Sequence, residues 1–191
     1  MPTNLVRLGA PGALLAGVAW IVAGILDVVT PSLTPLEEAL ILVALLGTLG
    51  GLTGLHFQQA RSYGRLESFL SRQGRNYGWL GAIGFLAAFI GSTLMLIGLA
   101  ISLSGKGAAL GLAFPNLALG VGFPGIFAGY VLLGIATLRL KLLPQWCGLA
   151  LIVCLPVAVA LGEYGGGIVI GLTWLGLSYA LLSQGNKSAL F

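Results

Sequence analysis

The composition of this 191-residue chain excludes an ordinary water-soluble domain. Only 7% of its residues are charged and 58% are hydrophobic, whereas soluble domains carry roughly a quarter charged residues. We interpret the formal net charge of +4 as a signal of membrane orientation, and not as an affinity for nucleic acid.

Six apolar segments account for most of the chain. Continuous apolar runs of about 20 residues match the hydrocarbon thickness of a bilayer, and such runs cover residues 9–29, 35–55, 77–103, 116–138, 144–161 and 164–182. The in/out alternation that barrel strands need is missing, so helices must satisfy the backbone hydrogen bonds in lipid. The sequence therefore predicts a single all-α integral membrane domain over 1–191, with six transmembrane helices arranged as three hairpins.

The first segment carries Asp27 in its last turn. An acid within a membrane helix is by default a candidate for function, although at a helix end it can also reach interfacial water. Glu163 lies in the glycine-rich turn between the fifth and sixth segments. If both carboxylates face one outer vestibule, they could gather a cation or a proton there.

Glycines in the second and fourth segments recur at helical spacing. Such faces let transmembrane helices approach closely, so that dispersion forces hold them together. The predicted packing positions are Gly47, Gly50, Gly51 and Gly54 in the second segment, and Gly125 and Gly129 in the fourth. We expect this face to pack within the protein, although it could also receive a partner chain, a flat lipid or a pigment.

His56, the only histidine, stands at the end of the second segment. One histidine cannot form a bis-histidine haem site or the usual metal clusters, so the sequence predicts no metal and requires no cofactor. His56 could still hold one haem or chlorophyll-type pigment as an axial ligand. Alternatively, it interacts with the negative end of its helix.

A polar segment follows His56. Its arginines Arg61, Arg65 and Arg72 repeat near the helical period, opposite an apolar stripe that includes Leu66 and Phe69. This pattern predicts a short cytoplasmic amphipathic helix over 61–74, lying in the membrane interface. Together with Arg75, these arginines would contact anionic lipids.

The basic residues fall almost entirely on one side of a six-span arrangement. Lys106 alone falls on the other side; the positions on the first side are Arg7, Arg61, Arg65, Arg72, Arg75, Arg139, Lys141 and Lys187. By the positive-inside rule, both termini are expected in the cytoplasm. We therefore predict a multi-pass protein of the bacterial inner membrane.

The middle of the predicted spans offers little for chemistry. Long stretches carry no charge, and Thr93, Thr137, Thr173 and Ser178 are the modest polar candidates. Ion-coupled transporters usually need stronger polar groups at this depth. No recognisable catalytic motif accompanies them.

Two regions carry a resemblance to known proteins. Gly54-Leu55-His56 with Gln59-Ala60 and Gly64-Arg65, and Gly134-Ile135-Ala136-Thr137-Leu138-Arg139 with Pro144-x-Trp146, resemble a group of small, uncharacterised bacterial multi-pass membrane proteins. The resemblance implies that residues 66–76 are an addition, because the corresponding loop in that group is shorter. It implies no activity, ligand or site residue.

Three functions remain open from the sequence. The first is a non-catalytic accessory or interaction subunit that packs against other membrane chains, lipids or an apolar ligand. The second is a small transporter or channel for a solute or ion, with Asp27 and Glu163 at its outer mouth. The third, a membrane enzyme acting on a lipid or quinone, lacks a recognisable catalytic set.

Overall fold

The described part of the chain forms six α-helices. The computed structural model describes residues 4–30, 34–66, 73–104, 113–140 and 143–187, and these ranges contain no strand. The helices are α1 (Asn4–Val29), α2 (Pro35–Leu66), α3 (Gln73–Leu103), α4 (Ala113–Leu140), α5 (Gln145–Leu161) and α6 (Gly166–Lys187), with a 3-10 turn η2 (Gly162–Tyr164) before α6. The predicted all-helical structure is confirmed. Five helices are long and apolar enough to cross a membrane, whereas α5 is shorter.

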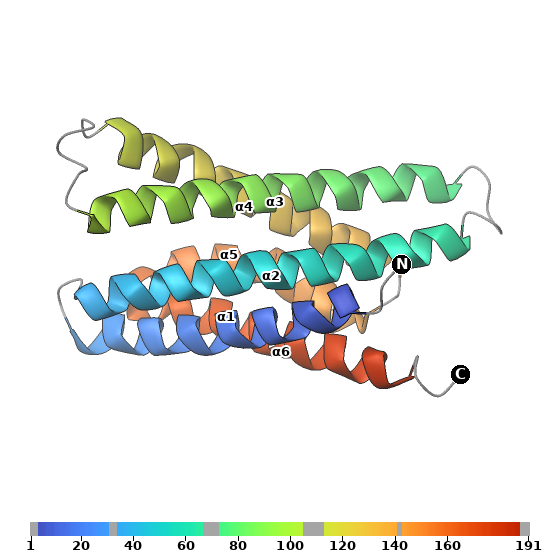
Figure 1. The fold of residues 1–191 in the computed structure, drawn as a ribbon, viewed down its shortest axis with the longest axis horizontal. Coiled ribbons are helices and arrows are strands. Elements are labelled where there is room, and N and C mark those ends of the chain that lie inside the picture. Colours follow the sequence, from blue (N-terminus) through green and yellow to red (C-terminus); the bar gives the residue numbers. More distant parts are fainter. Residues whose placement is uncertain (1–3, 31–33, 67–72, 105–112, 141–142, 188–191) are drawn as a thin grey trace.

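The helices form a ring in the order of the sequence. Each helix packs against the next one along the chain, and α6 returns to pack against α1. The start of α1 and the end of α6 lie at the same end of the elongated bundle (Figure 1). The contacts are most extensive between α1 and its two neighbours and between α3 and α4. The ring therefore consists of two tight helix groups, α6–α1–α2 and α3–α4, which meet where α2 contacts α3 and are bridged by α5.

Small residues account for the tight contacts. A Cβ atom added to Gly47 would lie 2.6 Å from the backbone nitrogen of Ala16, and one added to Gly125 would lie 3.2 Å from the carbonyl oxygen of Ala87. The six glycines singled out in the sequence all face a neighbouring element: Gly47, Gly50 and Gly54 face α1, Gly51 faces α1 and Trp174 of α6, and Gly125 and Gly129 face α3. This proximity favours dispersion contacts between backbones.

The start of α2 follows from its sequence. Thr34 precedes the helix, and its Oγ1 accepts a hydrogen bond of 3.3 Å from the backbone N–H of Glu37. A side-chain oxygen at this position satisfies one of the N–H groups that a helix start leaves free. Glu37 is buried, with 4% of its surface exposed.

The helix boundaries in the polar segment that follows His56 differ from the predicted ones. Residues 61–66 continue α2 without interruption, and residues 73–74 already belong to α3. A separate helix over 61–74 is therefore wrong for these positions; residues 67–72 lie outside the described part of the chain. At about 1.5 Å per residue, the 32 residues of α2 extend about 48 Å, well beyond one hydrocarbon core.

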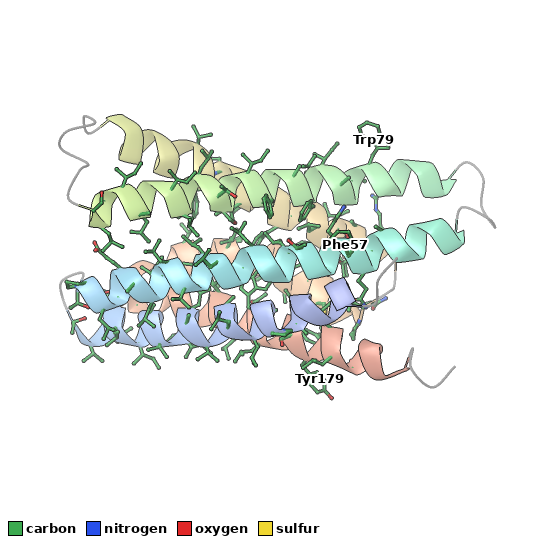
Figure 2. The ribbon with its side chains drawn as sticks, in the orientation of Figure 1. Phe57, Trp79 and Tyr179 are labelled. Atoms are coloured by element: carbon green, nitrogen blue, oxygen red, sulfur yellow. The ribbon has the colours of Figure 1, made fainter. Side chains whose placement is uncertain are left out.

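The outside of the ring is apolar on every helix. Large hydrophobic side chains are exposed at, for example, Val18, Leu46, Ile90, Phe127, Val153 and Leu172. Trp79 of α3 and Tyr179 of α6 are 69% and 71% exposed, and both point away from the bundle (Figure 2). Aromatic side chains of this kind are enriched where a membrane protein meets the headgroups.

Candidate functional site: a cavity at the centre of the ring

A cavity of about 60 Å³ lies between the two helix groups. Every one of the six helices contributes to its lining, which consists of Trp20, Leu45, Thr48, Ser92, Met95, Phe123, Ile126, Tyr130, Leu155 and Ile170. The surface that faces the cavity is almost wholly apolar, although four of these ten side chains carry a nitrogen or oxygen atom. Trp20, Thr48 and Ser92 stand near the middle of the apolar stretches of α1, α2 and α3, so the cavity lies deep within the bundle.

Two of the polar residues, Thr48 and Ser92, each follow a glycine in the sequence. Gly47 precedes Thr48 and faces α1; Gly91 precedes Ser92, and its Cβ position lies 2.7 Å from the backbone nitrogen of Ile126 in α4. The next residue along each helix lies about 100° further round the helix axis, and at these two positions it faces the ring's interior. Thr48 and Ser92 are consequently 2% and 0% exposed.

The hydroxyls of Thr48 and Ser92 differ from other hydroxyls in the bundle in their hydrogen bonding. Thr53, Thr93, Thr137 and Thr173 each donate a hydrogen bond to a carbonyl one turn earlier in their own helix, as hydroxyls in helices often do. Thr48 Oγ1 and Ser92 Oγ have no hydrogen-bond partner, and the buried Nε1 of Trp20 has none either. Three residues of the lining thus carry unbonded polar atoms, which are themselves buried from the cavity.

Tyr130 supplies the fourth polar group of the lining. Its hydroxyl accepts a hydrogen bond of 3.1 Å from Nε1 of the fully buried Trp174, and the two rings meet edge to face with centroids 5.9 Å apart. The Thr48 hydroxyl lies beside that of Tyr130, but outside hydrogen-bond geometry. The Tyr130–Trp174 pair thus connects α4 with α6.

His56 lies outside this cavity, where α2 meets α3. Its ring stacks on Phe85 with centroids 4.2 Å apart and planes inclined by 14°, while its Nδ1 is buried without a hydrogen-bond partner. One turn further along α2, the amide nitrogen of Gln59 donates to Thr137 Oγ1 of α4 over 3.0 Å. These contacts give His56 and Gln59 a role in joining the two helix groups, and pigment ligation by His56 stays a prediction.

The two acids come from neighbouring elements. Asp27 is partly exposed in the last turn of α1, and η2, which contains Glu163, packs against α1. The side chain of Glu163 lies outside the described set, as do those of Arg61, Arg65, Arg72 and Arg75. Among the described residues, no three His, Cys, Asp or Glu side chains come together as a metal site would require.

Four of the cavity residues were not among the candidates predicted from the sequence: Trp20, Thr48, Ser92 and Tyr130. The polar candidates that were predicted have hydroxyls hydrogen-bonded to backbone carbonyls: Thr93, Thr137, Thr173 and Ser178. One signal was present: Gly-Thr at 47–48 and Gly-Ser at 91–92 each join a packing residue to a hydroxyl.

Comparisons of this chain with protein-family models, with curated proteins and with solved structures found no match. The resemblance to small bacterial multi-pass proteins therefore stays a prediction, and the geometry of the bundle is the basis for inferring a function.

Proposed function

We propose that this chain is an integral membrane protein of a bacterial inner membrane, with α1–α2, α3–α4 and α5–α6 as three spanning hairpins. The apolar outer surface supports this proposal on every helix. With 17 residues, α5 is about 25 Å long, at the short end of the range for spanning helices. Leu149, Val153 and Val159 make its outer side apolar, as lipid contact requires.

In this proposal both termini lie in the cytoplasm. Arg7, Arg61, Arg65, Arg75, Arg139 and Lys187 all belong to helix ends at the end of the bundle that holds the termini (Figure 1). Arginine and lysine accumulate on the cytoplasmic side of membrane proteins. Near an anionic leaflet each basic residue contributes about 1 kcal/mol of attraction, so Arg61, Arg65, Arg72 and Arg75 would anchor this end to acidic lipids.

The function that the geometry supports best is the non-catalytic binding of an apolar ligand by an accessory membrane subunit. The observation that carries this proposal is the central cavity, which lies between two helix groups and is lined from all six helices. Ligand sites in helical membrane and bundle proteins commonly lie between helices, with a few polar groups in an apolar lining. Among the described residues, the lining includes no carboxylate, histidine, lysine or arginine, which favours binding over chemistry.

Copurification tests this function. The protein is extracted from native membranes with a mild detergent, and mass spectrometry compares its bound small molecules with the bulk lipid extract. We expect a specific apolar compound with the native protein and its loss from a Ser92→Leu variant, whose larger side chain fills the cavity. Thr93→Leu on the same helix is the control, because Thr93 does not line the cavity.

A bound fraction identical to bulk lipid in all three proteins would refute ligand binding. Partner chains are identified in the same preparations, and an absorption spectrum tests the pigment hypothesis for His56. A colourless preparation would end that hypothesis without affecting the central cavity.

A second candidate, a small transporter or channel, is favoured by the packing of η2 against α1. This contact brings the backbone segments that carry Asp27 and Glu163 next to each other. If the two acids attract a cation at an outer mouth, liposomes containing the protein will conduct Na⁺ or protons, and Asp27→Asn will abolish the flux. Flux equal to that of protein-free liposomes would exclude this candidate.

A further inference from the structure

The surface of the central cavity offers almost no hydrogen bond to an occupant. The unbonded atoms Trp20 Nε1, Thr48 Oγ1 and Ser92 Oγ are buried from the cavity. The Tyr130 hydroxyl already accepts the N–H of Trp174. A buried water makes about three hydrogen bonds, and a polar group buried without a partner loses the hydrogen bonds that it had outside. We therefore expect the cavity to exclude water and polar groups alike.

The size of the cavity limits the shape of an occupant. Its volume is about 60 Å³, well below the roughly 150 Å³ of an apolar protein cavity that binds benzene. A ring, and with it a pigment, a sterol or the head of a quinone, is therefore too wide for this space. The last few carbons of a straight hydrocarbon chain are narrow enough to fill it.

The cavity comes close to the lipid at Phe123. This residue lines the cavity and is 38% exposed on α4. Met95 of α3, also in the lining, has its Cγ 2.8 Å from the position that a Cβ atom would take on Gly122, the residue before Phe123. A methionine side chain is flexible and adapts to irregular gaps. A chain whose end occupies the cavity can thus continue past Phe123 to the outside of the bundle.

The stabilisation of a bound chain end comes from filling the cavity. A hydrocarbon chain gains nothing from the hydrophobic effect when it moves from lipid to an apolar site, but an empty void leaves its lining without dispersion contacts. Filling about 60 Å³, at the free energy per volume found for protein cavities, corresponds to roughly a tenfold gain in binding. A polar group at the tip of the chain offsets this gain, because it would be buried without a hydrogen bond.

We propose that the central cavity binds the methyl end of a straight hydrocarbon chain, while the polar end of the same molecule stays outside the bundle. The site then selects its ligand by the tip of the chain and not by the headgroup. This proposal rests on the proposed function, since it names the class of ligand for the same cavity. Such tips belong to the acyl chains of phospholipids and to free long-chain compounds, and the species enriched on copurification distinguishes these two sources.

Three probes with the same phosphocholine headgroup test the proposal. Undecylphosphocholine ends in a methyl group, ω-hydroxyundecylphosphocholine adds a hydroxyl to that tip, and 5-cyclohexylpentylphosphocholine has the same number of carbons but ends in a ring. Binding to the purified protein in a mild detergent is followed by NMR of ¹³C-labelled methionine methyl groups. The chain has two methionines, of which Met95 lines the cavity, and a Met95→Leu variant identifies its signal.

The methyl-tipped probe should shift the Met95 signal and show a nuclear Overhauser effect between the Met95 methyl and the end of the chain. The hydroxyl-tipped probe should bind roughly tenfold to a hundredfold more weakly, the effect of burying one unpaired polar group. The ring-tipped probe should leave the Met95 signal unchanged at the concentrations that saturate the first.

Two leucines of α5 provide a matched pair of variants. Both are buried, and Leu155 lines the cavity whereas Leu151, one turn earlier, does not. Leu155→Ala enlarges the cavity and should admit the ring-tipped probe, whereas Leu151→Ala should exclude it as the native protein does. Should Leu155→Ala fail to fold, Leu45→Ala enlarges the same cavity from α2, and the three probes on the native protein decide without any variant.

The outcomes separate the two proposals. If the hydroxyl-tipped or the ring-tipped probe shifts the Met95 signal as readily as the methyl-tipped one, the assignment of a methyl end is wrong while ligand binding stands. The same holds if no probe shifts this signal but a specific compound copurifies with the protein. If no probe shifts it and the copurified fraction equals bulk lipid, both proposals are wrong.

Discussion

At the residue scale, the hydrogen bond from Gln59 to Thr137 makes a measurable prediction. It is buried, with Gln59 2% and Thr137 1% exposed, and it joins α2 to α4 over 3.0 Å. Thr137→Val removes the acceptor and leaves the amide of Gln59 unpaired. We expect the free energy of unfolding in detergent to fall by about 1–2 kcal/mol.

Thr93→Val is the matched control for this prediction. Its hydroxyl donates only within its own helix, to Phe89, so valine costs less there. Gln59→Leu combined with Thr137→Val completes a double-mutant cycle. Equal losses for Thr137→Val and Thr93→Val would show that the bond between α2 and α4 contributes nothing.

Neighbouring hydroxyls also show what the sequence could not reveal. Ser92 and Thr93 are adjacent polar residues in an apolar helix, and by composition either could line a site. In the structure Thr93 donates to its own helix, whereas Ser92 faces the ring's interior without a partner. The difference depends on which way each side of the helix is turned: Gly91, next to Ser92, packs against α4. Candidate site residues therefore could not be chosen from hydroxyl chemistry alone.

At the scale of the element, two glycines of α4 allow the effect of helix packing on stability to be distinguished from the effect of helix propensity. A Cβ atom on Gly129 would lie 2.6 Å from Cβ and 2.7 Å from Cα of Ala88 in α3, whereas one on Gly120 meets no atom within 4 Å. Gly129→Ala should push α3 and α4 apart and destabilise the fold by about 1–3 kcal/mol. Gly120→Ala should be stabilising by about 0.5–1 kcal/mol, because alanine favours the helix.

Both changes are measured as shifts in the unfolding free energy of the same detergent-solubilised protein. The prediction would be wrong if the two alanines had effects of the same sign and size. That result would mean that α3 and α4 are not held together by the close approach at Gly129.

The sequence predicted correctly that the described elements are helices, but it predicted the ends of these helices less well. Each apolar run became a helix because a hydrophobic stretch of this length must satisfy its backbone internally. The segment 61–74 was misassigned because a separate amphipathic helix and the polar continuation of a longer helix share the same 3.6-residue period. Residues 61–66 in fact continue α2. No residue among them indicates that the helix runs on from residue 60.

At the scale of the whole molecule, orientation can be tested with a single cysteine. Both native cysteines, Cys147 and Cys154, are free and buried, so the native protein is the unlabelled control for a membrane-impermeant maleimide. Tyr164, 88% exposed in η2, lies at the end of the bundle opposite the termini. With cytoplasmic termini, Tyr164→Cys will be labelled in intact cells from outside. Tyr179→Cys, toward the other end, will be labelled only after the cells are opened, and the reverse pattern would invert the proposed topology.

The closure of the ring between α6 and α1 has a consequence for biosynthesis. The face of α1 that contains Gly17 and Gly24 packs on Gly171 and Gly167 of α6, and the carbonyl of Ala10 accepts a hydrogen bond of 2.8 Å from Ser178. Because α1 leaves the ribosome before α6, this contact forms only after α6 has been made. Until α6 is inserted, α1 can pair with α2 alone, and a chain that stops before α6 will keep this narrow glycine face of α1 open to lipid or to quality-control proteases.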